Sequence, residues 1–471
     1  MATSTQPIAP ILPTLQAIVG SDNLLTEVSD CWPYGYDNSR RHHPPDCVVF
    51  AYQHSQVRQI AEACYEYNIP LISRGRGSGT TGATVPITGG VILSLERMNQ
   101  IIELDSQNRY MVAQPGVTNE AIQIAAKTAG FFWAPDPTSA AFCTLGGNLA
   151  YNSAGPRAVK YGTTRDNTLG LKAVTGTGET LHTGVFTTKG VVGYDLTRLL
   201  IGSEGTLAVI TEAILKLTPL PESKRTIRID FPDIDSAANA VACIMAQPTT
   251  PCALEFIDRN AIQMIRDYSD VDLPDDLGAL LMVEVDGAAS HLAEMVDDIR
   301  NAVQPTHPLR FIIATTDSEV QALWATRKAL SPALRKIAPK KINEDIVVPV
   351  SYIPKLISGL DQLATHYGIK IVNFGHAGNG NIHTNLLLDT NDQKQVKNAP
   401  DCLNAVFDLV LSLRGTLSGE HGVGLEKRDY IAKELDPVSL RLMRGIKQQF
   451  DPKGILNPGK MLPEADPATH A

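Results

Sequence analysis

Arg74-Gly-Arg-Gly-Ser-Gly-Thr-Thr-Gly82 is the stretch of sequence that decides the fold of this chain. It follows an apolar run at residues 70–73 that is typical of a β-strand. Its last six residues match G-x-G-x-x-G, the glycine pattern of a nicotinamide-binding Rossmann fold. That fold also needs a helix to begin at the glycines, because the helix N-terminus binds the pyrophosphate. Pro86, Gly89 and Gly90 interrupt any such helix, and the run at 91–95 resembles a strand, so the pattern argues against a Rossmann fold.

The same stretch predicts a loop that binds an anionic group. Glycines permit positive φ angles, so successive N–H groups can converge around a phosphate, and the two arginines add positive charge. Taken alone, the stretch would fit a glycine-rich surface loop equally well. The residues that we expect to contact phosphate are Arg74, Gly75, Arg76, Gly77, Ser78, Gly79, Thr80 and Gly82.

The segments on either side of this loop predict alternating strands and helices. Residues 47–51 form an apolar run that predicts a strand, and apolar residues at helical spacing within 55–67 predict a helix. Further strands are predicted at 90–95 and 110–113, and a helix at 119–130 that ends at its glycine. The cluster Pro219-Leu-Pro221 predicts a domain boundary, beyond which strands and helices alternate again.

In this order, the segments resemble the flavoprotein fold shared by vanillyl-alcohol oxidase and p-cresol methylhydroxylase. The resemblance runs from the Arg74 loop through the segments at 135–139, 144–148, 152–155, 161–166 and 201–211. It implies that the first loop wraps the diphosphate of FAD and that the later segments contact the rest of the cofactor. The further FAD contacts that it implies are Pro135, Asp136, Thr138, Ser139, Gly146, Asn148, Asn152, Ser153, Gly155, Tyr161, Gly162, Glu204, Gly205 and Ile210. The first loop contains no histidine, so we expect non-covalent FAD, with Cys143 leaving a covalent link open.

A pair of histidines carries most of the remaining information. His376 and His383 lie on either side of Asn379-Gly380, which is the preferred dipeptide of a two-residue hairpin turn. With that turn the two histidines would be directly opposite each other on one sheet face, with Cβ atoms about 5 Å apart. Two imidazoles so placed can share a divalent metal; the alternative is a pair of surface histidines on a hairpin.

Glu420-His421 is the second motif of this kind, and glycines flank it. Adjacent side chains on an extended chain point apart, so the two residues can serve different partners. We therefore predict that Glu420 is a third metal ligand and that His421 is a general base. Without the histidine pair, such a motif would carry little meaning.

Both motifs resemble the C-terminal half of the FAD-linked D-2-hydroxyacid dehydrogenases. This family includes D-lactate dehydrogenase, the catalytic subunit of glycolate oxidase and D-2-hydroxyglutarate dehydrogenase. The resemblance implies a zinc- or manganese-like ion on His376, His383 and Glu420, with His421 as the base. It also implies that Arg327 binds the substrate carboxylate and that Asn457 returns to the flavin.

One position departs from the hydroxyglutarate members of the family. Those enzymes carry a lysine for the distal carboxylate, and alignment on Asp345 and Pro349 places Asn343 at that position. Lys340 and Lys341 lie nearby in the sequence. The departure favours a monocarboxylate substrate over hydroxyglutarate without eliminating the latter.

Composition limits the function classes. The 471 residues are 43% apolar and 19% charged with a net charge of −9, which is ordinary for a globular protein and argues against nucleic-acid binding. The seven cysteines form no C-x-x-C pair, so no iron–sulfur or zinc cysteine cluster is expected. No apolar run approaches a transmembrane length, and the first basic residue is Arg40, which argues against a targeting peptide. The expected location is the cytoplasm, with peripheral attachment at the inner membrane face as an alternative.

We therefore predict an α+β protein with a two-subdomain FAD-binding domain and a substrate domain built on an antiparallel sheet. The predicted domains are an N-terminal helical segment (1–41), the FAD domain (42–221), the substrate domain (222–420) and a C-terminal return to the FAD domain (421–471). The predicted reaction is FAD-dependent oxidation of a small D-2-hydroxy acid, D-lactate or glycolate, to the 2-oxo acid. Electrons would pass to a quinone, a cytochrome, an electron-transfer flavoprotein or an iron–sulfur partner subunit, and a homodimer is one option for the assembly.

Other functions stay open from the sequence. They are oxidation of D-2-hydroxyglutarate, an FAD-dependent alcohol or phenol oxidase without a metal, a zinc hydrolase without flavin, and a binding protein without turnover.

Overall fold

The computed structural model describes residues 7–268, 273–337 and 340–464, which divide into two compact units. Unit 1 contains the chain up to Gly155, Gly162–Leu220 and the chain from Glu420 onward. Unit 2 contains Pro156–Tyr161 and Pro221–Gly419. The chain therefore leaves and re-enters unit 1 twice, and a six-residue excursion into unit 2 interrupts the predicted FAD domain.

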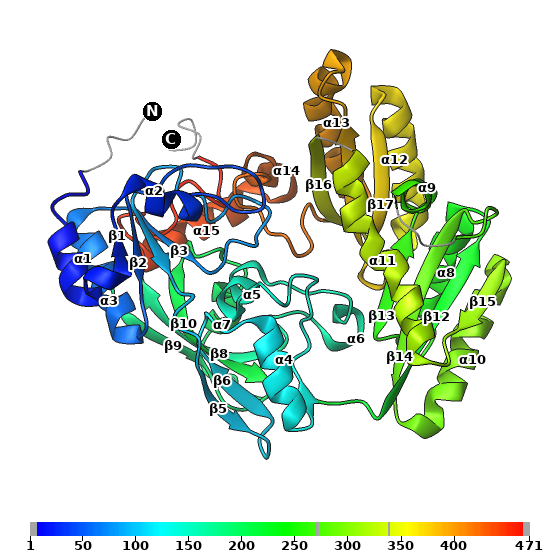
Figure 1. The fold of residues 1–471 in the computed structure, drawn as a ribbon, viewed down its shortest axis with the longest axis horizontal. Helices are drawn as coiled ribbons and strands as arrows, with labels where there is room; N and C mark the ends of the chain where they lie inside the picture. The colour runs from blue at the N-terminus through cyan, green and yellow to red at the C-terminus, as the bar shows by residue number, and fades with distance from the viewer. Residues whose placement is uncertain (1–6, 269–272, 338–339, 465–471) are drawn as a thin grey trace. The chain divides into compact units, whose positions relative to one another are not determined.

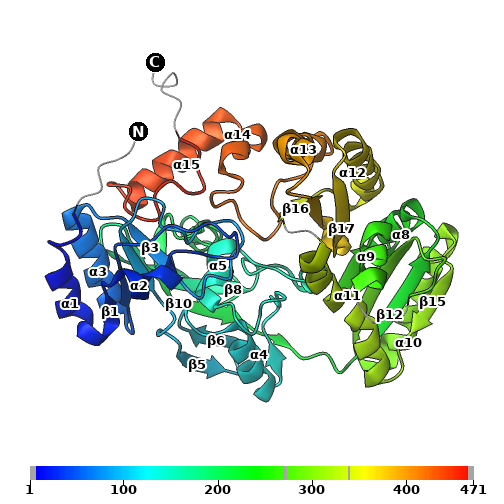
Figure 2. The same cartoon turned by 45° about the horizontal axis from the view of Figure 1, so that its top comes forward.

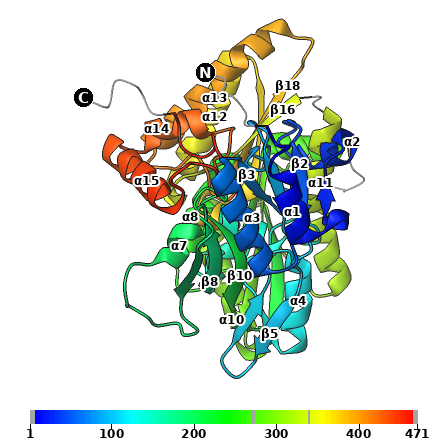
Figure 3. The ribbon, with the colours of Figure 1, turned by 90° about the vertical axis from the view of Figure 1, so that its left-hand side faces the viewer.

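The first sheet of unit 1 has the strand order β1-β2-β4-β3. Strand β4 (Val91–Ser94) pairs in parallel with both β2 (Cys47–Phe50) and β3 (Leu71–Arg74). The buried apolar faces of these strands pack with α1 (Leu12–Val19) and α3 (His54–Tyr67), as Figure 3 shows. The phosphate-loop candidate follows directly on β3, because Arg74 is the last residue of that strand.

The second sheet of unit 1 is antiparallel, with the strand order β5-β6-β10-β8-β9. Its apolar face packs with α4 (Asn119–Thr128), α5 (Leu145–Tyr151), α7 (Leu196–Leu200) and residues of α15 (Pro437–Phe450). Helices α4 and α5 each begin at a threonine, Thr118 and Thr144, whose hydroxyl accepts a backbone N–H of the first turn. The strands are β5 (Ile101–Asp105), β6 (Tyr110–Ala113), β8 (Thr168–Thr175), β9 (Thr180–Gly184) and β10 (Ala208–Lys216).

Short elements complete unit 1. They are β1 (Leu24–Leu25), α2 (Val28–Cys31), β7 (Phe131–Phe132), β11 (Thr218–Pro219) and α14 (Ile431–Glu434).

Unit 2 is built on one seven-stranded sheet with the order β15-β12-β14-β13-β17-β18-β16, and every neighbouring pair is antiparallel (Figure 1). Strands β13 and β14 near its centre are buried along almost their whole length, which agrees with their mostly apolar sequences. The strands are β12 (Ser223–Phe231), β13 (Ala253–Ile257), β14 (Ala279–Gly287), β15 (Arg310–Ile313), β16 (Lys340–Val347), β17 (Lys370–His376) and β18 (Asn381–Leu388).

Helices cover this sheet in two groups (Figure 2). Helix α9 (Arg259–Tyr268) and α11 (Asp317–Ile337) pack on the face that carries Phe374 and Leu387. A second layer forms because α8 contacts both α10 and α12, and α12 contacts α13. Its helices are α8 (Ile234–Ala246), α10 (Leu292–Val303), α12 (Ile353–Tyr367) and α13 (Gln393–Ser412), and the short α6 (Ala158–Tyr161) contacts β13.

The predicted α+β class and the antiparallel sheet of the substrate domain are confirmed. Strands are present where 47–51, 90–95 and 110–113 predicted them, and α3 and α4 occupy the two predicted helical segments. In the part of the chain that the structure describes, no helix combines the length and apolar character that a membrane span needs.

Candidate functional site

His376 and His383 lie on adjacent strands of unit 2, at the end of β17 and inside β18. Both are buried, with 5% and 7% of their surface exposed, and their ring centroids are 5.2 Å apart. The predicted register is wrong, because His376 pairs with Asn381 and His383 pairs with Phe374. The two histidines are therefore diagonal neighbours, which still lie on the same sheet face because side chains alternate along a strand.

The turn explains the difference in register. A 3₁₀ turn at Ala377–Asn379 precedes Gly380, so four residues connect the strands in place of two. Gly380 has φ of +73°, and its carbonyl accepts the N–H of Val348 at 3.1 Å. A Cβ atom on Gly380 would lie 1.8 Å from the carbonyl oxygen of Val348. Contact with Val348, directly after β16, thus favours this turn. The sequence of the hairpin alone does not reveal that contact.

Glu255 joins His376 to Arg327 in the same unit. It lies opposite His376 on the neighbouring β13, is fully buried, and hydrogen bonds to Nδ1 of His376. Arg327 of α11 donates from Nε to the other carboxylate oxygen at 2.7 Å, and its guanidinium lies over the ring of Phe374. Glu255 was missed in the sequence, where the available signal was a single acid inside the apolar run Ala253–Ile257.

Charge explains why Glu255 is stable at this position. Burial raises its pKa, but the interactions with His376 and with the guanidinium of Arg327 outweigh burial and hold the pKa at about 2. Glu255 is therefore a carboxylate at neutral pH, and it fixes the orientation of one imidazole and one guanidinium. A carboxylate on the second nitrogen of a histidine is the usual support of a metal-binding imidazole.

Glu420 is the residue at which the chain leaves unit 2. The preceding Gly419 donates its N–H to the backbone and the side chain of Asp345, which lies opposite His383 in the sheet. Glu420 itself is the first residue of the chain that returns to unit 1, so its role as the third ligand stays a prediction. One oxygen of Glu420 also accepts the N–H of Gly155 at 2.9 Å.

His421 follows in a glycine-rich segment of unit 1 that has no regular secondary structure. The hydroxyl of Thr81 lies 3.4 Å from the carbonyl of His421, and the carbonyl of Thr81 accepts the N–H of Leu425. Glu204 accepts the N–H groups of Val423 and Gly424 at 2.6 and 2.7 Å. The backbone on the C-terminal side of His421 is therefore held by side chains and carbonyls of unit 1.

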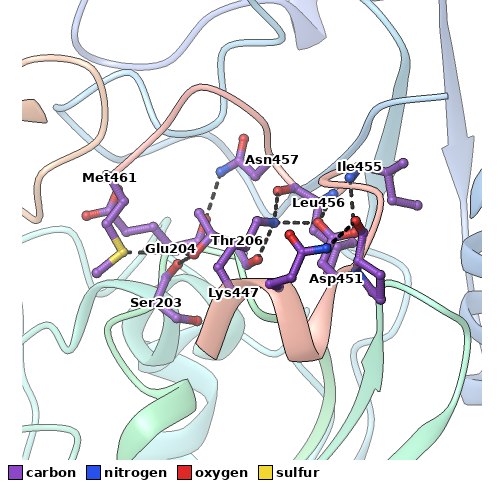
Figure 4. Close-up of polar contacts among 11 residues, drawn as sticks. Ser203, Glu204, Thr206, Lys447, Asp451, Ile455, Leu456, Asn457 and Met461 are labelled. Carbon is purple, nitrogen blue, oxygen red and sulfur yellow. Dashed lines mark hydrogen bonds and ion pairs between the residues drawn. The ribbon is translucent and has the colours of Figure 1, made fainter. Parts of the chain in front are cut away.

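Glu204 is itself unusual. Its side chain is buried, its φ is +53°, and burial raises its pKa to about 7 although the two N–H bonds oppose that shift. Asn457 donates to its carbonyl at 2.7 Å (Figure 4). Left-handed backbone is uncommon outside glycine, so the contacts around Glu204 must offset the cost of this conformation.

The predicted phosphate loop leaves β3 as expected, and Arg74 lies underneath it. The Arg74 guanidinium donates to the carbonyl of Tyr36 and to the hydroxyl of Thr84, and a Cβ atom on Gly77 would lie 2.3 Å from it. Gly77 and Gly82 have positive φ, as the nest prediction requires of some loop glycines. Arg74 thus supports the loop from below, while Arg76 is exposed.

One hollow of unit 1 contains several of the predicted cofactor residues. Its other lining residues include Thr144, Gly147 and Ser203, which belong to the segments that the resemblance covers, and Tyr151, which lies outside them. The predicted cofactor residues in its wall are Arg74, Gly75, Gly146, Glu204, Gly205 and Ile210.

Several of the remaining predicted cofactor residues lie in adjacent segments of unit 1, and Tyr161 lies in unit 2. Asp136 donates its N–H to the carbonyl of Ala154, and a Cβ atom on Gly155 would lie within 3 Å of Asp136, so the segments at 135–139 and 152–155 are adjacent. Asn152 accepts the N–H of Arg165 beyond Gly162. Tyr161 clusters with unit 2, where its hydroxyl donates to Asp286 at 2.8 Å.

The hollow has the chemistry that a large, flat, anionic cofactor needs. Gly75, Gly146 and Gly147 let a ligand approach the backbone closely. Tyr151 is half-buried, but its hydroxyl oxygen is inaccessible and makes no hydrogen bond of normal geometry to the residues that the structure describes. A buried hydroxyl without a partner indicates a place for a ligand atom or water.

Two protein families match the chain. "FAD binding domain" matches residues 45–184, and "FAD linked oxidases, C-terminal domain" matches residues 220–461. The solved structure of p-cresol methylhydroxylase is similar with a TM-score of 0.79 over 96% of both chains, at 18% identity, which confirms the predicted vanillyl-alcohol oxidase-type fold.

Curated relatives match almost the whole chain. The glycolate oxidase subunit GlcD of Bacillus subtilis is 37% identical over 91% of both chains. A D-lactate dehydrogenase of Anaerostipes hadrus is 33% identical over 88% of this chain and 89% of its own length. A D-2-hydroxyglutarate dehydrogenase of Stutzerimonas stutzeri is 31% identical over 96% of this chain and 98% of its own length. The chain therefore belongs to the FAD-linked oxidase family that contains these relatives, and it is an FAD-dependent oxidoreductase.

Proposed function

We propose that this protein oxidises a small D-2-hydroxy acid, D-lactate or glycolate, to the 2-oxo acid. Relatives named for glycolate and D-lactate support this substrate class. The observation that carries the proposal is the buried pair of His376 and His383, with Glu255 bonded to His376, because a redox enzyme that acts on a hydroxyl group gains from a cation at that oxygen. Glu420 is proposed as the third ligand of that cation.

Two imidazoles and a carboxylate are a ligand set that Zn²⁺ or Mn²⁺ accepts. Both histidines are buried, and Glu255 supports His376 through its second nitrogen, so the residues present fit such an ion. When bound there, the ion would supply positive charge that lowers the pKa of the substrate hydroxyl.

His421 is the residue that we assign to the hydroxyl proton. A neutral imidazole accepts a proton near pH 7, and Nδ1 or Nε2 of His421 would take it from the 2-hydroxyl group. Arg327 is assigned to the substrate carboxylate, and Glu255 and Phe374 hold its guanidinium in one orientation. With the carboxylate and the hydroxyl group fixed, the single C2 hydrogen of D-lactate and that of L-lactate point in different directions, which is the basis for selecting the D enantiomer.

FAD, when bound in unit 1, supplies the hydride acceptor of the reaction. We propose that it is bound without a covalent link. Cys143, the residue that left a link open, is buried and its sulfur contacts the side chain of Asn148.

A monocarboxylate substrate is favoured over D-2-hydroxyglutarate by Asn343. Its amide donates to the side-chain oxygen of Asn385 at 2.7 Å, so an uncharged amide pair occupies the position next to His383 in the sheet. Such a pair carries no positive charge for a second carboxylate. Because one relative is a D-2-hydroxyglutarate dehydrogenase, D-2-hydroxyglutarate is the second candidate substrate.

The electron acceptor stays a prediction. The relative from Bacillus subtilis is named as a subunit of glycolate oxidase, which supports a partner subunit for this chain as well. A quinone, a cytochrome or an electron-transfer flavoprotein are the alternative acceptors.

The decisive experiment is an anaerobic screen of D- and L-2-hydroxy acids against the purified holoprotein, with flavin absorbance as the readout. We expect D-lactate or glycolate to bleach the flavin, and L-lactate to leave it oxidised. Treatment with a chelator should abolish bleaching while FAD stays bound. Full bleaching after the metal is removed would contradict the metal-assisted mechanism, and bleaching by phenols or simple alcohols alone would favour an oxidase of the same fold.

A further inference from the structure

A buried carboxylate of unit 1 contacts the chain beside the proposed base. Glu204 follows α7, and its own N–H donates to the carbonyl of Ala150 near the end of α5. Asn457 fixes its carbonyl from the C-terminal segment (Figure 4). The Glu204 backbone is therefore held on two sides, and its carboxylate is directed at the segment that follows His421.

The two carboxylate oxygens each accept one backbone N–H. Oε1 accepts from Val423 at 2.6 Å and Oε2 accepts from Gly424 at 2.7 Å. These are short hydrogen bonds to an ionisable acceptor, and such bonds are stronger than those between neutral groups. No helix or sheet fixes residues 421–424, so these bonds do the work that regular secondary structure does elsewhere.

Steric contacts restrict the same segment. A Cβ atom on Gly422 would lie 2.6 Å from both Oε1 of Glu204 and the ring of Tyr151. A Cβ atom on Gly424 would lie 2.2 Å from the carbonyl oxygen of Thr81. Both glycines have positive φ. The backbone is thus pressed against Glu204, Tyr151 and Thr81, and it has little room to shift.

We propose that Glu204 is the positioning residue for His421, because its carboxylate fixes the backbone two and three residues beyond the imidazole that we assign as the base. This proposal rests on the proposed function of His421. It also changes the predicted role of Glu204, from a cofactor contact to an anchor of the base-bearing segment.

The test compares Glu204→Gln with the wild-type holoprotein, using D-lactate or glycolate, whichever reduces the wild-type flavin faster. A glutamine side chain has one acceptor oxygen, so one of the two N–H groups loses its partner. We expect hydrogen–deuterium exchange to increase at the amides of 421–425. We expect the limiting rate of anaerobic flavin reduction to fall about 10- to 100-fold while the apparent substrate Kd changes less than about threefold, because a small displacement of a catalytic group affects the rate more than binding.

Asp451→Asn is the matched control for the loss of a buried anchor. Asp451 is also a buried carboxylate in unit 1, and it accepts the N–H groups of Ile455 and Leu456 (Figure 4). In Asp451→Asn, faster hydrogen–deuterium exchange should be confined to the amides near 451–457. The amides of 421–425 should exchange as in the wild type. A fall in rate that only reflects lost stability would occur in both variants.

Gly422→Ala approaches the same contact from the other side, should Glu204→Gln fold poorly. It should give the same separation of rate from binding. Gly130→Ala is its control, because Gly130 has a similar φ of +83° with nothing within 4 Å of the added Cβ.

Three results would overturn the proposal. The first is loss of FAD from Glu204→Gln, which would make Glu204 a cofactor ligand. The second is hydrogen–deuterium exchange at 421–425 that is as slow in Glu204→Gln as in the wild type. The third is faster exchange at 421–425 in Glu204→Gln while its flavin is still reduced at the wild-type rate. His421→Gln, measured in parallel, tests the base assignment separately, since full-speed reduction in that variant contradicts the proposed function whatever Glu204 does.

Discussion

The histidine hairpin of unit 2 and the His421 segment of unit 1 hold their functional side chains in opposite ways. His376 and His383 are on strands β17 and β18, where ladder hydrogen bonds to neighbouring strands fix the backbone. His421 lies in a segment without regular structure, which contacts from Thr81 and Glu204 hold in place. The difference teaches that ladder hydrogen bonds fix the backbone of a side chain on a sheet, whereas the backbone of one on a loop depends on a few specific side-chain anchors.

The largest effect is expected from His421→Gln, which removes the side chain and leaves its backbone anchors. The rate of anaerobic flavin reduction should fall about 10²- to 10⁴-fold, the usual contribution of a general base. FAD content should be unchanged. His182→Gln, on the exposed part of β9, is the control and should reduce at the wild-type rate. Equal rates of flavin reduction in the two variants would show that His421 is not the general base.

A smaller loss is expected on the sheet side, from His376→Ala and His383→Ala. Each should lower the bound metal, measured by elemental analysis, from about one ion per chain to near zero. The rate should fall about 10²- to 10³-fold, since a metal ion supplies several kcal/mol of stabilisation to a developing oxyanion. His366→Ala in the exposed part of α12 should keep both metal and rate. An unchanged metal content in the two site variants would refute the metal assignment.

Glu255→Gln tests how much the sheet site depends on one supporting residue. We expect 10- to 100-fold weaker metal binding, because the glutamine cannot fix His376 and Arg327 as a carboxylate does. Competition with a coloured chelator measures the affinity. Glu284→Gln is matched to it, since Glu284 is also buried in this sheet but contacts Thr226 and Trp324. If both variants bind metal equally well, Glu255 has no supporting role.

The smallest effect concerns the anchor of the loop side and its pH dependence. Burial raises the pKa of Glu204 to about 7, above the ordinary glutamate value of 4.5. Between pH 4.5 and about 7, Glu204 is therefore protonated in the folded protein but ionised in the unfolded chain. The free energy of unfolding consequently decreases as the pH rises through this range. The wild type should lose at most about 3 kcal/mol relative to Glu204→Gln across this range. Thermal unfolding of both proteins from pH 5 to 8 measures it, and a constant difference in Tm would show an ordinary pKa.

The sequence was most informative where spacing alone specifies structure. The strand and helix pattern around the Arg74 loop, and the glycines and Pro86 that exclude a Rossmann helix, predicted the fold class. It was less informative about Arg74 itself, whose guanidinium lies beneath the loop because the carbonyl of Tyr36 and the hydroxyl of Thr84 accept its hydrogen bonds.

Contacts between distant segments account for what sequence reasoning missed. The hairpin register was wrong because Val348 of a neighbouring segment selects a longer turn at Gly380. Glu255 was missed because an acidic residue in an apolar strand indicates that a partner exists but not which residue it is. The partner, His376, is 121 residues away in the sequence.

By itself, the sequence determined the composition, the periodicity of the strands and helices, the glycines that permit close backbone approach, and the motifs that contain His376, His383 and the Glu420-His421 pair. These follow from local steric and periodic rules, which act within a few residues. The tertiary structure decided the partners: the diagonal placement of the two histidines, the Glu255 bridge, and the Glu204 anchor on the chain beyond His421. Such partners depend on hydrogen bonds and charges that act over a few ångströms, and only the folded chain brings those groups within that range.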